Sequence, residues 1–155
     1  SNFFKNTETE LRIGGIGQLK EELIAFALSK GVKNQVQFLG MLSREQVKQE
    51  MTDADCFVLS SRYETFGVVL IEALSCGTPV VATCCGGPED IVNEGNGLLV
   101  PVAQPDKLAE AMHTVYKNTN NYDSGKIAKD CFERFGTDAF VQNATRLYKK
   151  ILEGV

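Results

Sequence analysis

Two glutamates with seven residues between them are the side chains of this sequence best placed to do chemistry. Glu72 lies within an apolar run at residues 66–76, where a carboxylate without a partner is costly to bury, so we expect it to meet a polar partner or a ligand. Glu64 lies in the polar stretch just before that run. If the run is a helix, Glu64 lies at its mouth and Glu72 about 9 Å further along.

The start of this expected helix is itself a candidate binding site. Free N–H groups and the helix dipole favour an anion at an N-terminus, and Gly67 lets a ligand approach the backbone closely. A phosphate suits the N–H groups, and sugar hydroxyls suit the carboxylates. A nucleotide-diphosphate sugar carries both. The alternative is a core helix whose glutamate pairs with an arginine and whose Gly67 only allows tight packing.

The elements that position these residues follow from hydrophobic periodicity. Short apolar or alternating runs predict strands at 10–13, 35–39, 56–59, 79–83 and 97–100. Helical spacing predicts helices at 18–30, 43–51, 66–76, 88–92, 106–117, 123–135 and 138–152, and Ser43 with Gln46 resembles a capping box. Alternation of strands and helices indicates an α/β fold with a mainly parallel, doubly wound sheet. Ligands of such sheets bind beyond the carboxyl ends of the strands.

Composition excludes several classes of function. The 155 residues suit one domain, and a net charge of −4 gives no basic footprint for nucleic acid. No apolar run reaches the roughly 18 residues that a membrane-spanning helix needs. Five cysteines without a C-x-x-C pair, together with the single His113, do not make a usual zinc set and indicate a reducing, cytosolic setting.

Other acidic and glycine-rich motifs have plainer interpretations. Asp53 and Asp55 imitate a metal-binding D-x-D motif but precede a strand, so we interpret them as solvated positions. Glu89 and Asp90 lie in the first turn of a short helix, where acidic residues complement the dipole. The segment 14–17 lacks the spacing of a dinucleotide fingerprint, and no P-loop motif is present.

The segment around the two glutamates resembles the E-x7-E signature of the family 4 retaining glycosyltransferases. The similarity extends, in order, over most of the chain, through the segments 36–40, 54–59, 60–83, 86–92 and 96–100. These enzymes have the GT-B architecture, in which two Rossmann-like domains hold the donor between them. The chain resembles the C-terminal, donor-binding domain.

The resemblance implies roles for the matching positions. Glu72 would accept hydrogen bonds from the donor ribose. Glu64 would be the catalytic residue and would hold the transferred sugar near its reacting carbon. The reaction would be transfer of a glycosyl unit to an acceptor hydroxyl with retention of configuration. It would need no metal or other cofactor, and no covalent role is assigned to Glu64.

The resemblance also implies that backbone groups and small residues surround the donor. The backbone N–H groups of four consecutive residues would bind it: Phe66 and Gly67 the sugar, Val68 and Val69 the diphosphate. Two further pairs would follow strand ends: Met41 and Leu42 beside the base, Gly15 and Gly17 beside the phosphate or ribose.

Two parts of the family pattern have no match here. The family's domain begins with one more strand and helix, whose loop supplies an Arg and a Lys to the diphosphate. The acceptor-binding N-terminal domain is also unmatched. We therefore expect residues 3–155 to be a partial donor-binding domain, preceded by an expression-tag remnant at 1–2, and not active alone.

The strand order 3-2-1-4-5-6 typical of such domains would place the missing strand at the centre of the sheet. We expect the strands at 10–13 and 56–59 to close up and pair. Residues 3–9 filling the slot and a second copy pairing across it, with self-association, are the alternatives.

The expected partners are a nucleotide-sugar donor and an acceptor glycan or lipid-linked sugar, at the inner face of a membrane or free in the cytoplasm. A GT-B-fold nucleotide-sugar epimerase and a non-catalytic nucleotide-binding fragment remain the alternatives.

Overall fold

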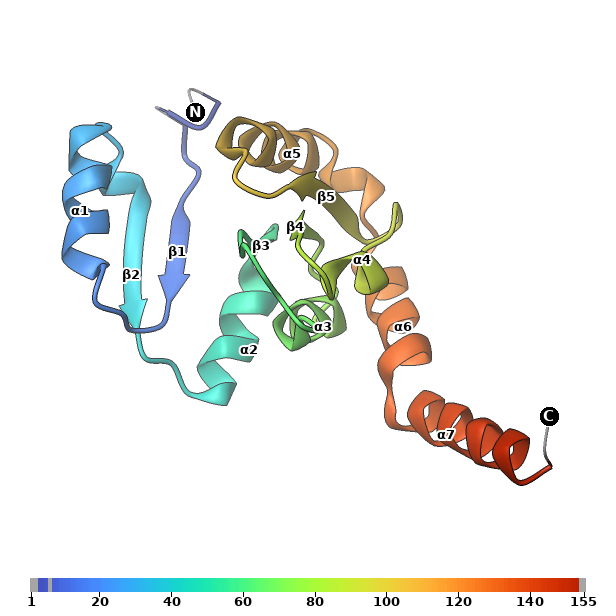
Figure 1. Ribbon diagram of the computed structural model, residues 1–155. Coiled ribbons are helices and arrows are strands. Elements are labelled where there is room, and N and C mark those ends of the chain that lie inside the picture. The colour runs from blue at the N-terminus through green and yellow to red at the C-terminus, as the bar shows by residue number, and fades with distance from the viewer. Residues whose placement is uncertain (1–2, 6, 154–155) are drawn as a thin grey trace. The chain divides into compact units, whose positions relative to one another are not determined.

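The structure, a computed structural model, describes residues 3–5 and 7–153. The expected tag remnant at residues 1–2 lies outside the described residues. The chain divides into two compact units, residues 1–50 and 51–155, with the division inside helix α2 (Arg44–Asp53). Figure 1 shows the helices and strands of both units.

The first unit is built on a pair of parallel strands. Strand β1 (Leu11–Gly14) pairs with β2 (Val36–Gly40), in a register that sets Ile13 opposite Phe38. Helix α1 (Lys20–Ser29) and the 3-10 turn η1 (Lys33–Gln35) connect the two strands. The pairing is parallel because the connection crosses over through a helix, as the alternating sequence pattern predicts.

The start of α2 confirms the predicted capping box. The backbone N–H of Ser43 donates to the side-chain oxygen of Gln46 at 2.8 Å, and the N–H of Gln46 donates to the Ser43 hydroxyl at 3.3 Å. Further along α2, Glu50 accepts two hydrogen bonds from Arg12 of β1, at 2.6 and 2.7 Å. This paired geometry fixes α2 against the strand pair of its own unit.

The second unit is a three-stranded parallel sheet with helices on both faces. Its strands are β3 (Phe57–Leu59), β4 (Val80–Cys84) and β5 (Gly97–Pro101), in the order β3-β4-β5. Its helical elements are α3 (Val68–Ser75), α4 (Pro88–Ile91), α5 (Pro105–Lys117), the 3-10 turn η2 (Thr119–Asn121), α6 (Ser124–Phe135) and α7 (Thr137–Leu152).

The core of the second unit follows from alternation along β4. Val81 packs with Val100 and with Ala111 and Val115 of α5. Leu70 and Leu74 of α3 are fully buried, as is Val80, the neighbour of Val81 in the strand. Because successive strand residues face opposite sides of the sheet, the central strand is covered on both faces. Figure 1 shows α5 and α3 on opposite sides of this sheet.

The predicted pairing of residues 10–13 with 56–59 is wrong. In the described chain β1 pairs with β2 and β3 with β4, and no ladder joins the two sheets. Nor do residues 3–5 and 7–10 form a strand. Each ladder instead joins strands linked by a helical crossover, which brings sequence neighbours together at little cost in loop closure.

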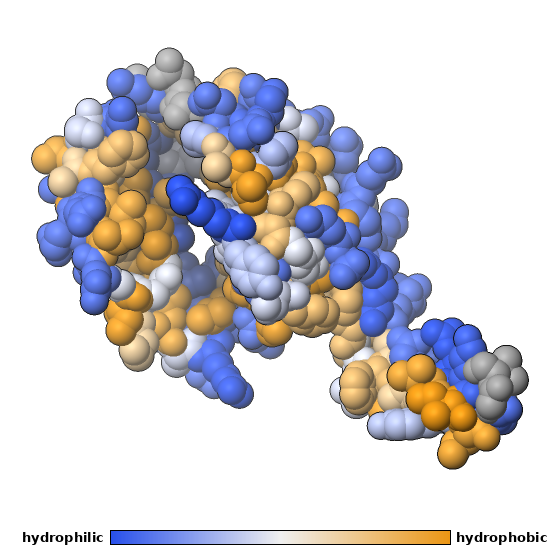
Figure 2. Space-filling view, viewed as in Figure 1, coloured by the Kyte–Doolittle hydropathy of each residue, from blue (hydrophilic) through white to orange (hydrophobic). Residues whose placement is uncertain are grey.

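Helix α7 has apolar side chains that the described chain leaves uncovered. None of its residues is buried, and Phe140, Leu147, Ile151 and Leu152 are among its exposed side chains. Figure 2 shows apolar side chains gathered on α7. No helix among the described residues has the length and apolar content needed to span a bilayer.

Candidate functional site

The loop that carries Glu64 is paired with the turn that follows β4. The backbone N–H of Glu64 donates to the carbonyl oxygen of Cys85 at 3.1 Å, and the N–H of Gly87 donates to the Glu64 carbonyl oxygen at 2.9 Å. Together these bonds form an isolated parallel bridge between Glu64 and Gly86. The position of Glu64 is therefore set by β4, the central strand of the sheet.

Two glycines make this arrangement possible. Gly67, the residue before α3, is buried and has φ 93°, a left-handed conformation that side chains other than glycine rarely adopt. Gly87 lies directly against the backbone of Phe66, where a Cβ atom would overlap the Phe66 carbonyl. The sequence predicts that Gly67 lets a ligand approach the backbone; the structure shows a positive φ at Gly67 and a close approach of two backbone segments at Gly87.

The N-terminus of α3 offers unsatisfied donors. No side chain of the described residues caps this helix, and the Leu70 N–H already donates to the carbonyl oxygen of Gly67 at 2.9 Å. The N–H groups of Gly67, Val68 and Val69 have no hydrogen-bond acceptor among residues 3–5 and 7–153. Free N–H groups of this kind, at the positive end of a helix, suit an anionic oxygen.

Glu64 lies beside these donors as the sequence predicts. Its side chain is half-buried, and one carboxylate oxygen accepts a hydrogen bond of 3.4 Å from the Phe66 N–H. Because that bond is long for an N–H···O contact, both groups retain capacity for another partner. The carboxylate and the free N–H groups thus share the mouth of α3.

The expectation that Glu72 is a buried charge is wrong. Helix α3 buries Leu70, Ala73 and Leu74, whereas Val68 and Glu72 are exposed. Val68 and Glu72 are four positions apart, so they share the side of the helix that faces away from the sheet. Although α3 is apolar in composition, only one of its faces is covered. Glu72 is therefore accessible to a ligand at the start of α3 without any burial cost.

The remaining predicted site residues belong to the first unit. The N–H of Gly15 donates to the Gly40 carbonyl oxygen at 2.7 Å, which joins the carboxyl ends of β1 and β2. Leu42 lies at the same end of the strand pair. Its Cδ1 atom would be 3.0 Å from the Cβ of a larger residue at position 14, so it packs closely against Gly14. Met41 is 74% exposed and Gly17 is also exposed. The structure thus brings Gly15 close to the Met41–Leu42 segment within this unit.

Sequence reasoning missed the part that Glu89 plays. Its carboxylate accepts hydrogen bonds from the N–H groups of Cys85, at 3.2 Å, and Gly86, at 3.0 Å. Glu89 therefore holds the turn that pairs with Glu64, besides lying in the first turn of α4. The three-residue spacing from Gly86 to Glu89 is a signal that would have found it, because it matches the reach of a capping glutamate.

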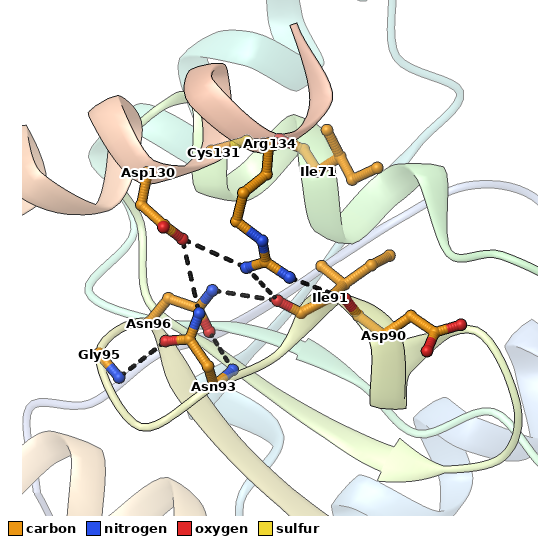
Figure 3. A network of polar contacts seen from close by, with 9 residues as sticks. All are labelled: Ile71, Asp90, Ile91, Asn93, Gly95, Asn96, Asp130, Cys131 and Arg134. Carbon is orange, nitrogen blue, oxygen red and sulfur yellow. Dashed lines mark hydrogen bonds and ion pairs between the residues drawn. The ribbon is translucent and has the colours of Figure 1, made fainter. Parts of the chain in front are cut away.

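A second missed feature is the network around Arg134 of α6, shown in Figure 3. The Arg134 guanidinium donates to the carbonyl oxygen of Ile91 at 2.9 Å and to that of Asp90 at 2.7 Å, and pairs with Asp130 at 3.2 Å. It thereby satisfies carbonyl groups at the end of α4, which lack partners within the helix. No sequence signal connects residues that lie 43 positions apart.

The thiol of Cys84, next to the site, is not activated. Partial burial raises the pKa of Cys84, and the nearby Glu89 and Cys85 groups raise it further. A raised pKa favours the protonated, less nucleophilic form of the thiol. Within the described part of the chain, no three His, Cys, Asp or Glu side chains are grouped so that they could hold a metal ion.

Comparison with known proteins identifies the family. The sequence pattern of the family described as "Glycosyl transferases group 1" matches residues 3–129. The chain belongs to this family. A protein of Methanocaldococcus jannaschii named as an uncharacterized glycosyltransferase is 32% identical over 147 residues, which cover 93% of this chain and 38% of that protein. A D-inositol 3-phosphate glycosyltransferase of Mycobacteroides abscessus is 40% identical over 87 residues, 56% of this chain and 20% of that protein.

Solved structures of glycosyltransferases share the fold. The lipopolysaccharide outer core galactosyltransferase WaaB matches with a TM-score of 0.81 and 27% identity, over 91% of this chain and 41% of that one. HepE of Anabaena, in complex with UDP-glucose, matches with a TM-score of 0.77 and 28% identity, over 90% and 41%. The group 1 chain thus has the α/β fold of the C-terminal, Rossmann-like domain of GT-B glycosyltransferases. It spans about two fifths of the length of the first curated relatives it matches.

Proposed function

We propose that this chain is the donor-binding part of a retaining glycosyltransferase and binds a nucleotide-diphosphate sugar at the start of α3. The observation that carries the proposal is the set of free N–H groups at Gly67, Val68 and Val69, with Glu64 at the same helix mouth and Glu72 exposed further along. Membership of a glycosyltransferase family supplies the reason to place a donor there.

Each group at this helix has a distinct partner in the proposed complex. The N–H groups of Val68 and Val69 bind the diphosphate, whose charge suits the helix dipole. The exposed Glu72 carboxylate accepts hydrogen bonds from the ribose hydroxyls. Glu64 and the N–H groups of Phe66 and Gly67 bind the transferred sugar. The E-x7-E spacing then separates sugar recognition from nucleotide recognition along one helix.

The proposal also assigns donor contacts to residues of the first unit. Met41 and Leu42 lie beside the base, and Gly15 and Gly17 border the phosphate or ribose. Residues 3–155 form this donor-binding domain, and a further part of the parent binds the acceptor. An Arg and a Lys from a segment unmatched in this chain neutralise the leaving diphosphate, so the chain alone binds the donor but is not active.

The proposed chemistry needs no metal and no enzymic nucleophile. The transition state resembles an oxocarbenium ion, and the leaving diphosphate is stabilised by the start of α3 and by positive side chains. Retention follows from attack of the acceptor hydroxyl on the face that the phosphate leaves, and the departing phosphate takes the hydroxyl proton. Glu64 orients the sugar near its reacting carbon.

The proposed acceptor is a glycan or a lipid-linked sugar, and the proposed setting is the cytoplasm or the inner face of a membrane. The relatives include proteins named as a D-inositol 3-phosphate glycosyltransferase and as a lipopolysaccharide core biosynthesis glycosyltransferase, so the family match leaves the acceptor class open. Acceptor choice lies with the part of the parent that this chain does not match.

A thermal-shift screen of the chain tests donor binding. UDP, GDP and ADP are compared at equal concentration, with and without EDTA. UDP is expected to raise the unfolding temperature most, because structural neighbours bind UDP or UDP-glucose, and EDTA is expected to change nothing. A ligand present at about 100 times its Kd adds about 2.7 kcal/mol to stability. No shift with any nucleotide would contradict the proposal for this chain.

The class of reaction is tested in the full-length parent. A transferase releases nucleoside diphosphate in proportion to acceptor, and the product keeps the anomeric configuration of the donor. The epimerase alternative predicts conversion of the nucleotide sugar without any acceptor. The family match favours the transferase. NMR of the product's anomeric proton decides between retention and inversion.

A further inference from the structure

The side chain of Phe66 is held by a residue far along the chain. Its ring meets the ring of Phe135 edge to face, with the ring centroids 6.5 Å apart and the planes at 82°. Even with this contact, Phe66 is 47% exposed. Edge-to-face pairs of this kind contribute beyond the area that they bury, so Phe135 restricts the rotamers open to Phe66.

Phe135 is in turn fixed at the end of α6. The neighbouring Arg134 places its guanidinium 4.7 Å from the centroid of the Phe135 ring and donates to the carbonyl oxygens of Asp90 and Ile91. These bonds tie the end of α6 to α4, as Figure 3 shows for Arg134. Helix α4 directly follows the turn that pairs with Glu64. The end of α6, the end of α4 and the Glu64 loop are therefore linked by consecutive contacts within the second unit.

Among these linked segments, the backbone of Phe66 is the part proposed to bind the sugar. Its N–H already donates to the Glu64 carboxylate at 3.4 Å, and Gly67, with its free N–H, follows directly. Loss of the ring contact would release the backbone torsions of Phe66, and a change in those torsions would turn its N–H and shift the carboxylate that it contacts. Val68 and Val69 are the first two residues of α3, so the helical backbone, and not the Phe66 ring, sets the direction of their N–H groups.

We propose that Phe135 is a positioning residue for the sugar side of the donor site and acts through the ring of Phe66. This inference rests on the proposed function and extends it beyond the matched family segment, which ends at residue 129. It separates two kinds of recognition. Loss of the Phe135 ring weakens binding of the sugar moiety and leaves binding of the nucleoside diphosphate unchanged.

The test titrates UDP and UDP-glucose into the whole chain and into three variants. For Phe135→Leu, the Kd of UDP-glucose is expected to rise about 3- to 10-fold, the range an aromatic pair supports, with the Kd of UDP unchanged. Phe135→Tyr keeps the ring and is expected to behave as wild type. Phe132→Leu is the matched control, because Phe132 lies on the same helix with its ring 68% exposed. Equal changes for both ligands, or none, would overturn the proposal.

A second measurement needs no ligand. Three-bond couplings across the Cα–Cβ bond of Phe66 are expected to report one rotamer in wild type and in Phe132→Leu, and averaging in Phe135→Leu. An unchanged Phe66 rotamer in Phe135→Leu would overturn the positioning role. If wild type binds neither ligand, the proposed function fails for this chain, and these couplings still decide whether Phe135 holds Phe66.

Discussion

The carbonyl oxygen of Glu64 accepts a 2.9 Å hydrogen bond from the backbone N–H of Gly87, and this bond helps to join the glutamate loop to the turn after the central strand. Gly87 also packs against the Phe66 carbonyl with no room for a side chain. At Glu64 the loop is thus held by backbone hydrogen bonds, which a substitution of the Glu64 side chain leaves in place.

Gly87→Ala is expected to destabilise the chain by about 1–3 kcal/mol, because the added methyl group meets the Phe66 backbone and not a flexible side chain. Urea unfolding measures the loss. Gly125→Ala is the matched control: it lies in α6, its nearest neighbour is the Asp123 carboxylate, and a helical alanine is neutral or stabilising. Equal stability for the two variants would show that Gly87 is not the close contact described.

Glu72→Gln is expected to keep the stability of wild type within about 0.5 kcal/mol, because Glu72 is exposed. It is expected to weaken nucleoside diphosphate binding by about 1–3 kcal/mol, the value of a hydrogen bond to a charged group. Calorimetry measures the affinity of wild type and of Glu72→Gln for the nucleoside diphosphate. Glu133→Gln, on the exposed side of α6, serves as control. Unchanged binding with a sharp fall in stability would make Glu72 a structural carboxylate.

Glu64→Ala, made in a full-length parent, is expected to lower turnover far more than it weakens nucleoside diphosphate binding. The reason is its place at the mouth of α3, beside the Phe66 N–H and apart from the helix face that carries Glu72. Steady-state rates and a binding titration on the same variant provide the comparison. Equal losses in the two would place Glu64 in the nucleotide site instead.

The Cys56 thiol makes the free energy of unfolding depend on pH in the alkaline range. Burial, with a smaller contribution from the Asp55 charge, raises the pKa of Cys56 from 9.0 to about 12. Below pH 9 the thiol is protonated in the folded and unfolded states alike. Between pH 9 and 12 only the unfolded chain loses the proton, so the free energy of unfolding falls by about 1 kcal/mol per pH unit.

The comparison of wild type with Cys56→Ala checks this dependence, because other groups that titrate in the same range are common to both chains. Urea unfolding at pH 8, 9, 10 and 11 is expected to show a steeper fall for wild type. Parallel curves would mean that the Cys56 thiol ionises as readily in the folded chain as in the unfolded one.

Local patterns in the sequence predicted most of the elements. The helix at 43–51 began with Ser43 and Gln46, and the structure has α2 at Arg44–Asp53 with that capping box formed. The apolar run at 79–83 became β4 at Val80–Cys84, the doubly covered central strand. These signals are contained within a few neighbouring residues, so no knowledge of the tertiary structure was needed.

Features that depend on distant contacts were not predictable in this way. The exposure of Glu72 depends on which face of α3 meets the sheet, and composition alone does not show that Val68, a valine, is 59% exposed beside it. The bonds from Arg134 to the end of α4 join segments that share no pattern. Strand pairing likewise depends on the whole sheet, which explains the wrong expectation for residues 10–13 and 56–59.

The most direct test of the central claim is a titration of UDP into the ¹⁵N-labelled wild-type chain, followed through its backbone amide resonances. The claim that the start of α3 binds the diphosphate predicts saturable shifts that are largest at Val68 and Val69, with smaller shifts at Phe66. The same titration of Glu72→Gln should need a higher UDP concentration to reach saturation. Shifts concentrated elsewhere in the chain, or no saturable shifts at α3, would contradict the account.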